Sequence, residues 1–246
     1  MRRYPTRGAH GELVHTLGAR VVSGQIATND ILNGDEIGLE FGVSRTVVRE
    51  ALKVLASKGL VESVKKLGTY ATQQSSWNWL DPDVMRWRFE NTDSFSLLED
   101  LGEVRLALEP IAARLAAMRR PEEEISAMGD AIMAMAQASK KGSINPGRFT
   151  EADIEFHSAI YRATRNQFLL SFSRVMETGL LIRDQLVHES DTEMADVVRK
   201  HRKIFEAIVA REPEVAEQRM TDLLIDAAAD ASRVVKARAL LAKRKK

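Results

Sequence analysis

The stretch FGVSRTVVREAL, residues 41–52, decides the fold of the first part of the chain. Gly42-Val43 predicts a tight turn, and Ser44 is a residue type that caps the helix after such a turn. This helix is expected to run to about Lys58, because Gly59 then stops it. Its inward face is apolar: Val47, Val48, Ala51, Leu52 and Leu55.

The residues before and after this stretch predict two further helices and a β-hairpin. Apolar residues at helical spacing predict a helix over 9–24, and Asn33 with Glu36 three residues later forms a plausible capping box for a second, short helix. Two β-like stretches, 60–64 and 69–71, follow the third helix. Three helices followed by a hairpin predict an N-terminal winged helix-turn-helix domain over residues 1–75.

Basic and hydroxyl side chains lie where such a domain meets DNA. The first turn of a recognition helix reaches base edges in the major groove, and Arg binds guanine O6 and N7 with two hydrogen bonds. Arg45 and Arg49 are four residues apart and therefore share one helix face. Short surface helices with two arginines are also common without any such role. The candidate DNA-binding residues are Ser44, Arg45, Thr46, Arg49, Lys65, Lys66 and Gly68.

The rest of the chain, residues 76–246, predicts an all-helical domain. Residues 73–78 are polar and indicate a linker, and Asp81-Pro82 has the N-cap and first-turn proline of a helix start. We expect helices near 81–90, 94–118, 121–140, 148–164, 167–188, 193–211 and 213–240. The predicted fold class is therefore mainly α, a winged helix-turn-helix followed by a helical bundle.

Ionisable residues interrupt the apolar faces of this bundle. Asp153 and His157 lie one turn apart on an apolar helix face, and His201 lies on the buried side of a distant helix. These residue types suit a divalent metal such as Zn, Ni or Mn. An Asp–His hydrogen bond within a helical core is the alternative. Arg105 lies within the stripe Leu101, Val104, Leu108, Ile111 and Leu115, and needs either an internal acid or a ligand carboxylate.

Composition and charge restrict the function classes. The chain has no cysteine, which excludes disulfides and thiolate metal sites. Residues 1–75 hold 10 basic and 7 acidic side chains, a net of +3, whereas residues 76–232 carry a net of −9. No signal peptide and no apolar run of about 20 residues is visible, so we expect a soluble, cytoplasmic protein without membrane contact.

The first domain resembles the GntR family of transcription regulators. The segments that carry the resemblance are 41–52, 55–62 and the wing ending Gly68-Thr69-Tyr70. The resemblance implies DNA contacts for Arg45, Thr46, Arg49 and Gly68. Two positions depart from the family: Asp35 stands where many members carry a base-reading Arg, and Lys66 stands at a wing position that is often Gly.

The second domain resembles the FCD effector domain of the FadR subfamily. Residues 103–110, Asp153-x-x-x-His157 and 200–204 carry this resemblance. Many members bind a divalent metal through Asp, His and two further His, which implies Asp153, His157 and His201 as ligands here. The fourth position holds Leu223, and the neighbouring Asp222 points elsewhere on its helix.

The segment 77–84 is similar to the linker of sugar-acid regulators, among them repressors of galactonate operons. The resemblances together imply a homodimeric repressor of a palindromic operator whose DNA affinity a small acidic metabolite controls, with Arg105, Asp153, His157 and His201 binding that effector. A metal-responsive regulator, in which the metal itself is the signal, is the alternative. The sequence has no Glu-x-x-His pair, nucleophile motif or phosphate loop, so we do not expect an enzyme.

Overall fold

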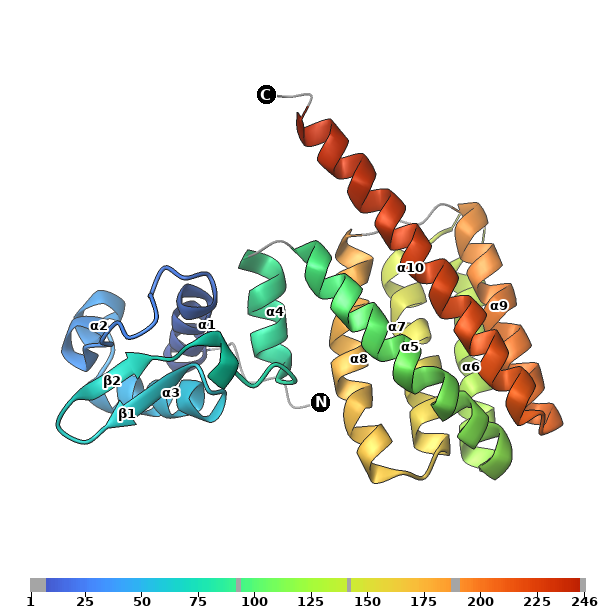
Figure 1. Ribbon diagram of the computed structural model, residues 1–246, viewed down its shortest axis with the longest axis horizontal. Helices are drawn as coiled ribbons and strands as arrows, with labels where there is room; N and C mark the ends of the chain where they lie inside the picture. The colour runs from blue at the N-terminus through green and yellow to red at the C-terminus, as the bar shows by residue number, and fades with distance from the viewer. Residues whose placement is uncertain (1–7, 92–93, 141–142, 187–190, 244–246) are drawn as a thin grey trace. The chain divides into compact units, whose positions relative to one another are not determined.

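The computed structural model describes residues 8–91, 94–140, 143–186 and 191–243. In these ranges it contains ten α-helices and one two-stranded sheet, and the chain divides into two compact units, residues 1–94 and 95–246 (Figure 1). The expected fold class, mainly α with an N-terminal winged helix-turn-helix and a C-terminal helical bundle, is confirmed. Within the described residues, no helix is both long and apolar enough to cross a membrane.

The first unit begins with three helices, α1 (Ala9–Val22), α2 (Gly34–Phe41) and α3 (Arg45–Ser57). Side-chain caps fix where the second and third begin. Asn33 accepts a hydrogen bond from the backbone N–H of Asp35, and Ser44 accepts one from that of Val47. Between α2 and α3 the chain turns at Gly42, whose φ of 63° lies in the left-handed region that favours glycine.

The wing is an antiparallel hairpin of β1 (Val61–Val64) and β2 (Gly68–Ala71), with Val61 opposite Ala71 and Val64 opposite Gly68. Lys66 in the connecting turn has a φ of 72°, which explains why glycine suits this position better. The hairpin and the helices share one apolar core, formed mainly by Leu13, Leu17, Val21, Ile37, Val48, Ala51, Leu55, Leu60 and Ala71.

A fourth helix, α4 (Pro82–Asn91), belongs to the same unit. It follows the short 3-10 helix η1 (Gln74–Ser76), and Trp77, Val84 and Trp87 are buried in the core of the winged helix. The structure therefore divides the chain after Ser94, whereas the polar residues 73–78 led us to expect the boundary after residue 75. The difference arises because α4 packs on α1, which the polarity of the preceding segment does not indicate.

A buried cation attaches the start of α4 to the end of α3. The ammonium of Lys58 lies 2.8 Å from Asp81 and 2.9 Å from Asp83, and only 8% of its side chain is exposed. Burial alone would lower the pKa of Lys58, but the hydrogen bonds that its ammonium donates to both carboxylates outweigh burial and raise it. Lys58 therefore stays charged and fixes the start of α4.

Among the residues described, the second unit is a bundle of six helices. They are α5 (Ser94–Arg119), α6 (Glu122–Ala138), α7 (Pro146–Ala163), α8 (Gln167–Leu186), α9 (Asp191–Ala210) and α10 (Pro213–Lys243). The helix α6 packs between α7 and α9, α8 packs on α7, and α10 packs on α9. All the helices expected from residue 81 onward are present, with ends that differ by a few residues.

One expectation about α5 is wrong. The stripe taken as its buried face is largely its outer face, because Val104 and Ile111 expose 39% and 48% of their surface. The buried face is offset around the helix and consists of small and ionisable residues: Arg105, Glu109, Ala112, Ala113 and Ala116. The side chains that α5 buries are therefore small or ionisable, and larger apolar residues such as Val104 and Ile111 lie on its exposed side.

Candidate functional site

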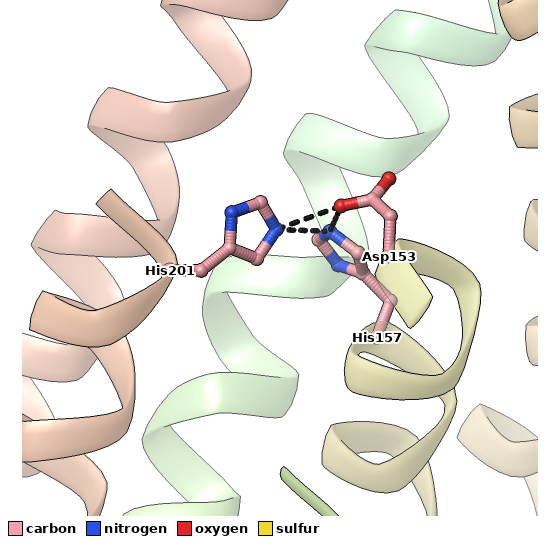
Figure 2. Close-up of side chains that lie close together, drawn as sticks. All are labelled: Asp153, His157 and His201. Carbon is pink, nitrogen blue, oxygen red and sulfur yellow. Dashed lines mark hydrogen bonds and ion pairs between the residues drawn. The ribbon is translucent and has the colours of Figure 1, made fainter. Parts of the chain in front are cut away.

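Three of the expected site residues meet in the core of the second unit (Figure 2). Asp153 and His157 lie one turn apart on α7, and His201 reaches them from α9. The Nε2 atom of His201 lies 2.8 Å from Asp153 Oδ1 and 3.3 Å from His157 Nε2. All three side chains are buried. Two imidazole nitrogens and one carboxylate oxygen therefore converge on one small region.

The opposite nitrogens of both imidazoles face acceptors. His201 Nδ1 lies 2.8 Å from the carbonyl oxygen of Val197, and His157 Nδ1 lies 2.7 Å from Glu109 Oε2. The second contact is close but not aligned as a regular hydrogen bond. In the tautomer with a proton on each Nδ1, both Nε2 lone pairs are available for a cation beside the carboxylate of Asp153. Such outer-nitrogen contacts are the arrangement that orients histidine ligands of metals.

Glu109 is the residue that the sequence analysis missed. It lies one turn after Arg105 on α5. Its carboxylate accepts hydrogen bonds from Arg105 Nε over 2.7 Å and from Arg105 Nη2 over 3.3 Å. Burial would raise the pKa of Glu109, but Arg105 and His157 outweigh burial and lower it to about 2. The spacing of four residues between Arg105 and Glu109 was the available signal. The sequence left either an internal acid or a ligand carboxylate as the partner of Arg105, and the structure shows an internal acid, Glu109.

If both imidazoles are neutral, the cluster carries more negative than positive charge. Burial would raise the pKa of Asp153, but its contacts with His201 and His157 lower it, so the carboxylate is ionised. With neutral imidazoles, Arg105, Glu109 and Asp153 give a net charge of −1. A buried, unbalanced charge is costly. Converging nitrogen and oxygen lone pairs with a net negative charge fit a divalent cation held by Asp153, His157 and His201.

Two cavities adjoin this cluster. A cavity of about 20 Å³ is lined by Asp153, His157, His201 and Leu223, and has room for a single water or ion. A larger cavity of about 530 Å³ lies between the residues 98–106 of α5 and 224–228 of α10. Arg105 lines both cavities. The larger cavity therefore gives a small molecule room beside the cluster.

One further buried polar group lies nearby without a partner. The hydroxyl of Tyr161, on α7, is buried and has no hydrogen bond. Burial and the charge of Glu109 raise the pKa of this phenol, so it stays protonated. An unpaired buried hydroxyl is costly, and Tyr161 is not among the residues that line the two cavities.

The expected DNA-contact residues of α3 lie on the surface of the first unit. Arg45, Thr46 and Arg49 are exposed, and Ser44 is exposed while it caps the helix. Arg45 pairs with Asp35, and Arg49 lies 3.6 Å from Glu50. These side chains are therefore exposed at the start of α3, the part of a recognition helix that contacts the major groove of DNA.

The wing lies beside this helix. Arg45, Arg49 and Gly68 line one open groove of about 590 Å³ between α2, α3 and β2. Lys65 and Lys66 are exposed at the tip of the hairpin and do not line that groove. The structure thus brings Arg45, Arg49 and Gly68 together along one groove. The two lysines lie apart from that groove, in the turn that joins β1 and β2.

Comparison with known proteins gives two family matches. The model described as bacterial regulatory proteins, gntR family, matches residues 10–71, and the FCD domain model matches residues 100–226. The solved structure of Lar, which controls the expression of the Listeria monocytogenes agr system, has a TM-score of 0.65 over 92% of this chain and 98% of that chain. At 16% identity, this likeness shows a shared fold.

Two curated relatives come from Escherichia coli (strain K12). The galactonate operon transcriptional repressor is 28% identical over 208 residues, 84% of this chain and 89% of that protein. The HTH-type transcriptional regulator YieP is 32% identical over 209 residues, 83% of this chain and 87% of that protein. The matches confirm the resemblances to the GntR family and to the FCD domain, and the expectation of a transcription regulator rather than an enzyme.

Proposed function

Because the chain belongs to the gntR family of bacterial regulatory proteins and carries an FCD domain, we propose that it is a repressor whose operator affinity is lowered by a small carboxylate effector. The FCD domain also supports assignment to the FadR subfamily. The observation that carries the proposal is the buried Asp153, His157 and His201 cluster, which Arg105 connects to a cavity of about 530 Å³. Action on a bacterial operator implies a cytoplasmic protein.

The winged helix supplies the DNA contacts in this proposal. The start of α3 enters the major groove, where Ser44, Arg45, Thr46 and Arg49 meet bases and phosphates. Lys65, Lys66 and Gly68 follow the adjacent backbone with the wing. Their exposure supports this role, because charge neutralisation of phosphates supplies much of the affinity for DNA.

The cluster and the larger cavity together suit a hydroxylated acid. A divalent cation held by Asp153, His157 and His201 would supply coordination positions for a carboxylate and balance the charge of the site. Because Glu109 already occupies two donors of Arg105, that guanidinium has only its remaining N–H groups for an effector.

The lining of the cavity also includes acidic side chains. Glu99, Asp100 and Glu103 line it and are exposed, so they offer acceptors for hydroxyl groups. An acid at one end and several hydroxyls at the other describe an aldonate sugar acid. The name of the galactonate operon repressor, a relative over most of the chain, supports this class.

Dimerisation is proposed through the outer face of α5. The α5 apolar face, defined here as Val104, Leu108, Ile111, Leu115 and Met118, is at least partly exposed at each of these positions. Apolar residues at spacings of three and four form the seam by which two helices pack. A two-fold dimer would bind a palindromic operator, and an effector would change the spacing of its two winged helices.

A metal-responsive regulator is the second candidate. The cavity of about 20 Å³ at the cluster favours it, because this space accepts one ion without any further ligand. In this case the metal alone changes operator affinity. In the first case the metal prepares the site and the acid changes operator affinity.

The experiment that separates the two uses the full chain and an operator selected by it from a random DNA pool. Fluorescence anisotropy measures operator affinity for metal-free protein, zinc-loaded protein and zinc-loaded protein with each aldonate of a panel. We expect at least one aldonate to weaken binding tenfold or more. An effect of zinc alone, with no response to any acid, would support the metalloregulator instead.

A further inference from the structure

An acid on α2 holds the first arginine of the recognition helix. Arg45 Nε lies 2.7 Å from Asp35 Oδ1, and Arg45 Nη2 donates to Asp35 Oδ2 over 3.0 Å. Two parallel hydrogen bonds of this kind fix the plane of a guanidinium as well as its position. The pair therefore determines which edge of Arg45 faces outward.

The carboxylate itself is held by a rigid element. The backbone N–H of Asp35 donates to the side chain of Asn33, the N-cap of α2, and Asp35 lies in the first turn of that helix. The position of the carboxylate is thus set by α2, and the guanidinium on α3 takes its orientation from it. The backbones of both residues belong to the helix-turn-helix and not to a loop.

Stability does not account for this pair. The Arg45 and Asp35 side chains are 85% and 59% exposed. Exposed ion pairs contribute little to folding because water and salt screen them. The pair also places a negative charge beside the expected DNA-contact surface, where it repels phosphates. Such an arrangement is explained if Asp35 acts on how Arg45 meets DNA.

The hydrogen bonds of Arg45 with Asp35 determine which of its N–H donors remain available for DNA. A guanidinium has five N–H donors, and Asp35 occupies one on Nε and one on Nη2. The edge formed by Nη1 and the second N–H of Nη2 stays available. That edge provides the two parallel donors that pair with guanine O6 and N7. Because the pair is neutral overall, Arg45 is at the same time a poor anchor for a phosphate.

We infer that Asp35 is a specificity-determining residue, which orients Arg45 to read a guanine and prevents it from serving as a non-specific phosphate contact. The inference rests on the proposed DNA contact by α3. Asp35 acts through Arg45 and is therefore a positioning residue. This role is particular to this chain, because the family pattern does not predict an acid at position 35.

The test compares D35N with a matched control, E36Q, in the full chain. Both variants remove one negative charge from the first turn of α2, but Glu36 receives a hydrogen bond from Asn33 and none from Arg45. The wild-type protein first selects its operator from a random DNA pool. Affinities are then measured for this operator and for versions with each base of the half-site replaced.

We expect D35N to lose about tenfold in discrimination at one guanine position. Its binding should also become more salt-dependent, with the slope of log K against log salt steeper by about 0.9, because Arg45 is released to neutralise a phosphate. E36Q should match the wild type in discrimination at every base. In an R45A background, D35N should change neither discrimination nor the slope.

Two results would overturn the inference. If D35N keeps the wild-type discrimination at every base of a site that the wild type does select, Asp35 is not a specificity residue, although the DNA-binding function stands. If E36Q loses as much discrimination as D35N, the effect belongs to charge in general and not to the pair. A wild-type protein that selects no site would contradict the proposed function itself, and the inference with it.

Discussion

The indole Nε1 of Trp87, on α4, donates a hydrogen bond to Nδ1 of His15, on α1, over 2.8 Å. This bond joins residues 72 positions apart and attaches α4 to the winged helix. The close fit between the two helices depends on Gly18, whose Cα faces the same indole ring. Because α4 is packed against α1 in this way, we expect a displacement of α4 to move the helices of the winged helix-turn-helix together with it.

The variant G18A tests this fit. A Cβ at position 18 would lie 2.4 Å from the ring of Trp87, so the two helices must separate. We expect a loss of about 1–3 kcal/mol in the free energy of unfolding. All three tryptophans, Trp77, Trp79 and Trp87, lie in the first unit, so their fluorescence in a urea titration reports on that unit.

Gly34 provides the control for G18A within the same unit. A Cβ there would meet only Val48 Cγ1 at 3.8 Å, an ordinary contact. We expect G34A to leave the free energy of unfolding unchanged or to raise it slightly, by about 0.4–1 kcal/mol. An unchanged midpoint for G18A would show that α4 is not held against α1 as described.

Leu223 offers a test of the metal proposal by gain of a ligand. It lines the small cavity beside Asp153, His157 and His201 and is 5% exposed. We expect L223H to supply a fourth ligand and to tighten zinc binding at least tenfold, about 1.4 kcal/mol. Competition with a chromophoric chelator measures the affinity. The control is Q218H, which adds a histidine at an exposed position of α10; a variant L223H no tighter than Q218H would contradict the site.

The wing tip gives a prediction in which stability and affinity change in opposite directions. Lys66 has a φ of 72°, so K66G should stabilise the free protein by about 1 kcal/mol. K65G removes the same charge without relieving strain and should destabilise it by about 0.5–1 kcal/mol. Both should weaken operator binding and reduce the salt slope by about 0.9. Operator titrations and urea unfolding check both effects, and equal stability changes in the two variants would refute the account of the turn.

The α5 apolar face predicts where a dimer can be broken. Ile111, at the middle of that face, is 48% exposed. We expect I111E to raise the dimer dissociation constant by a hundredfold or more, because it would bury an unpaired charge in the seam. Met133 on α6 is 55% exposed and outside this face, so M133E serves as the control. Sedimentation equilibrium gives both constants; a wild-type monomer, or an unaffected I111E dimer, would rule out this interface.

Much of the fold could be predicted from local signals in the sequence. Ser44 and Asn33 mark helix starts by their capping chemistry, and Gly42 marks the turn between helices, because each acts within three residues of itself. The place of α4 could not be predicted in this way. It depends on the contact of Trp87 with Gly18 and His15, and such distant contacts leave no periodic signal in one sequence.

The candidate site was predicted in part for a similar reason. Asp153 and His157 share one helix face, so their proximity follows from spacing, and the apolar neighbours of His201 placed it on the buried side of its own helix. The burial of Glu109 between Arg105 and His157 depends on which face of α5 points inward. The apolar stripe suggested the wrong face, because α5 buries the small side chains of Ala112, Ala113 and Ala116 and leaves larger apolar ones exposed.

The most direct test of the central claim is a calorimetric titration of galactonate into the full chain, because the claim is that the effector binds at the Asp153, His157 and His201 cluster through a held cation. The titration compares zinc-loaded protein, metal-free protein and the D153N variant treated with zinc. The account predicts binding to the zinc-loaded wild type and an affinity at least tenfold weaker in the other two samples. Equal affinity in all three would contradict it.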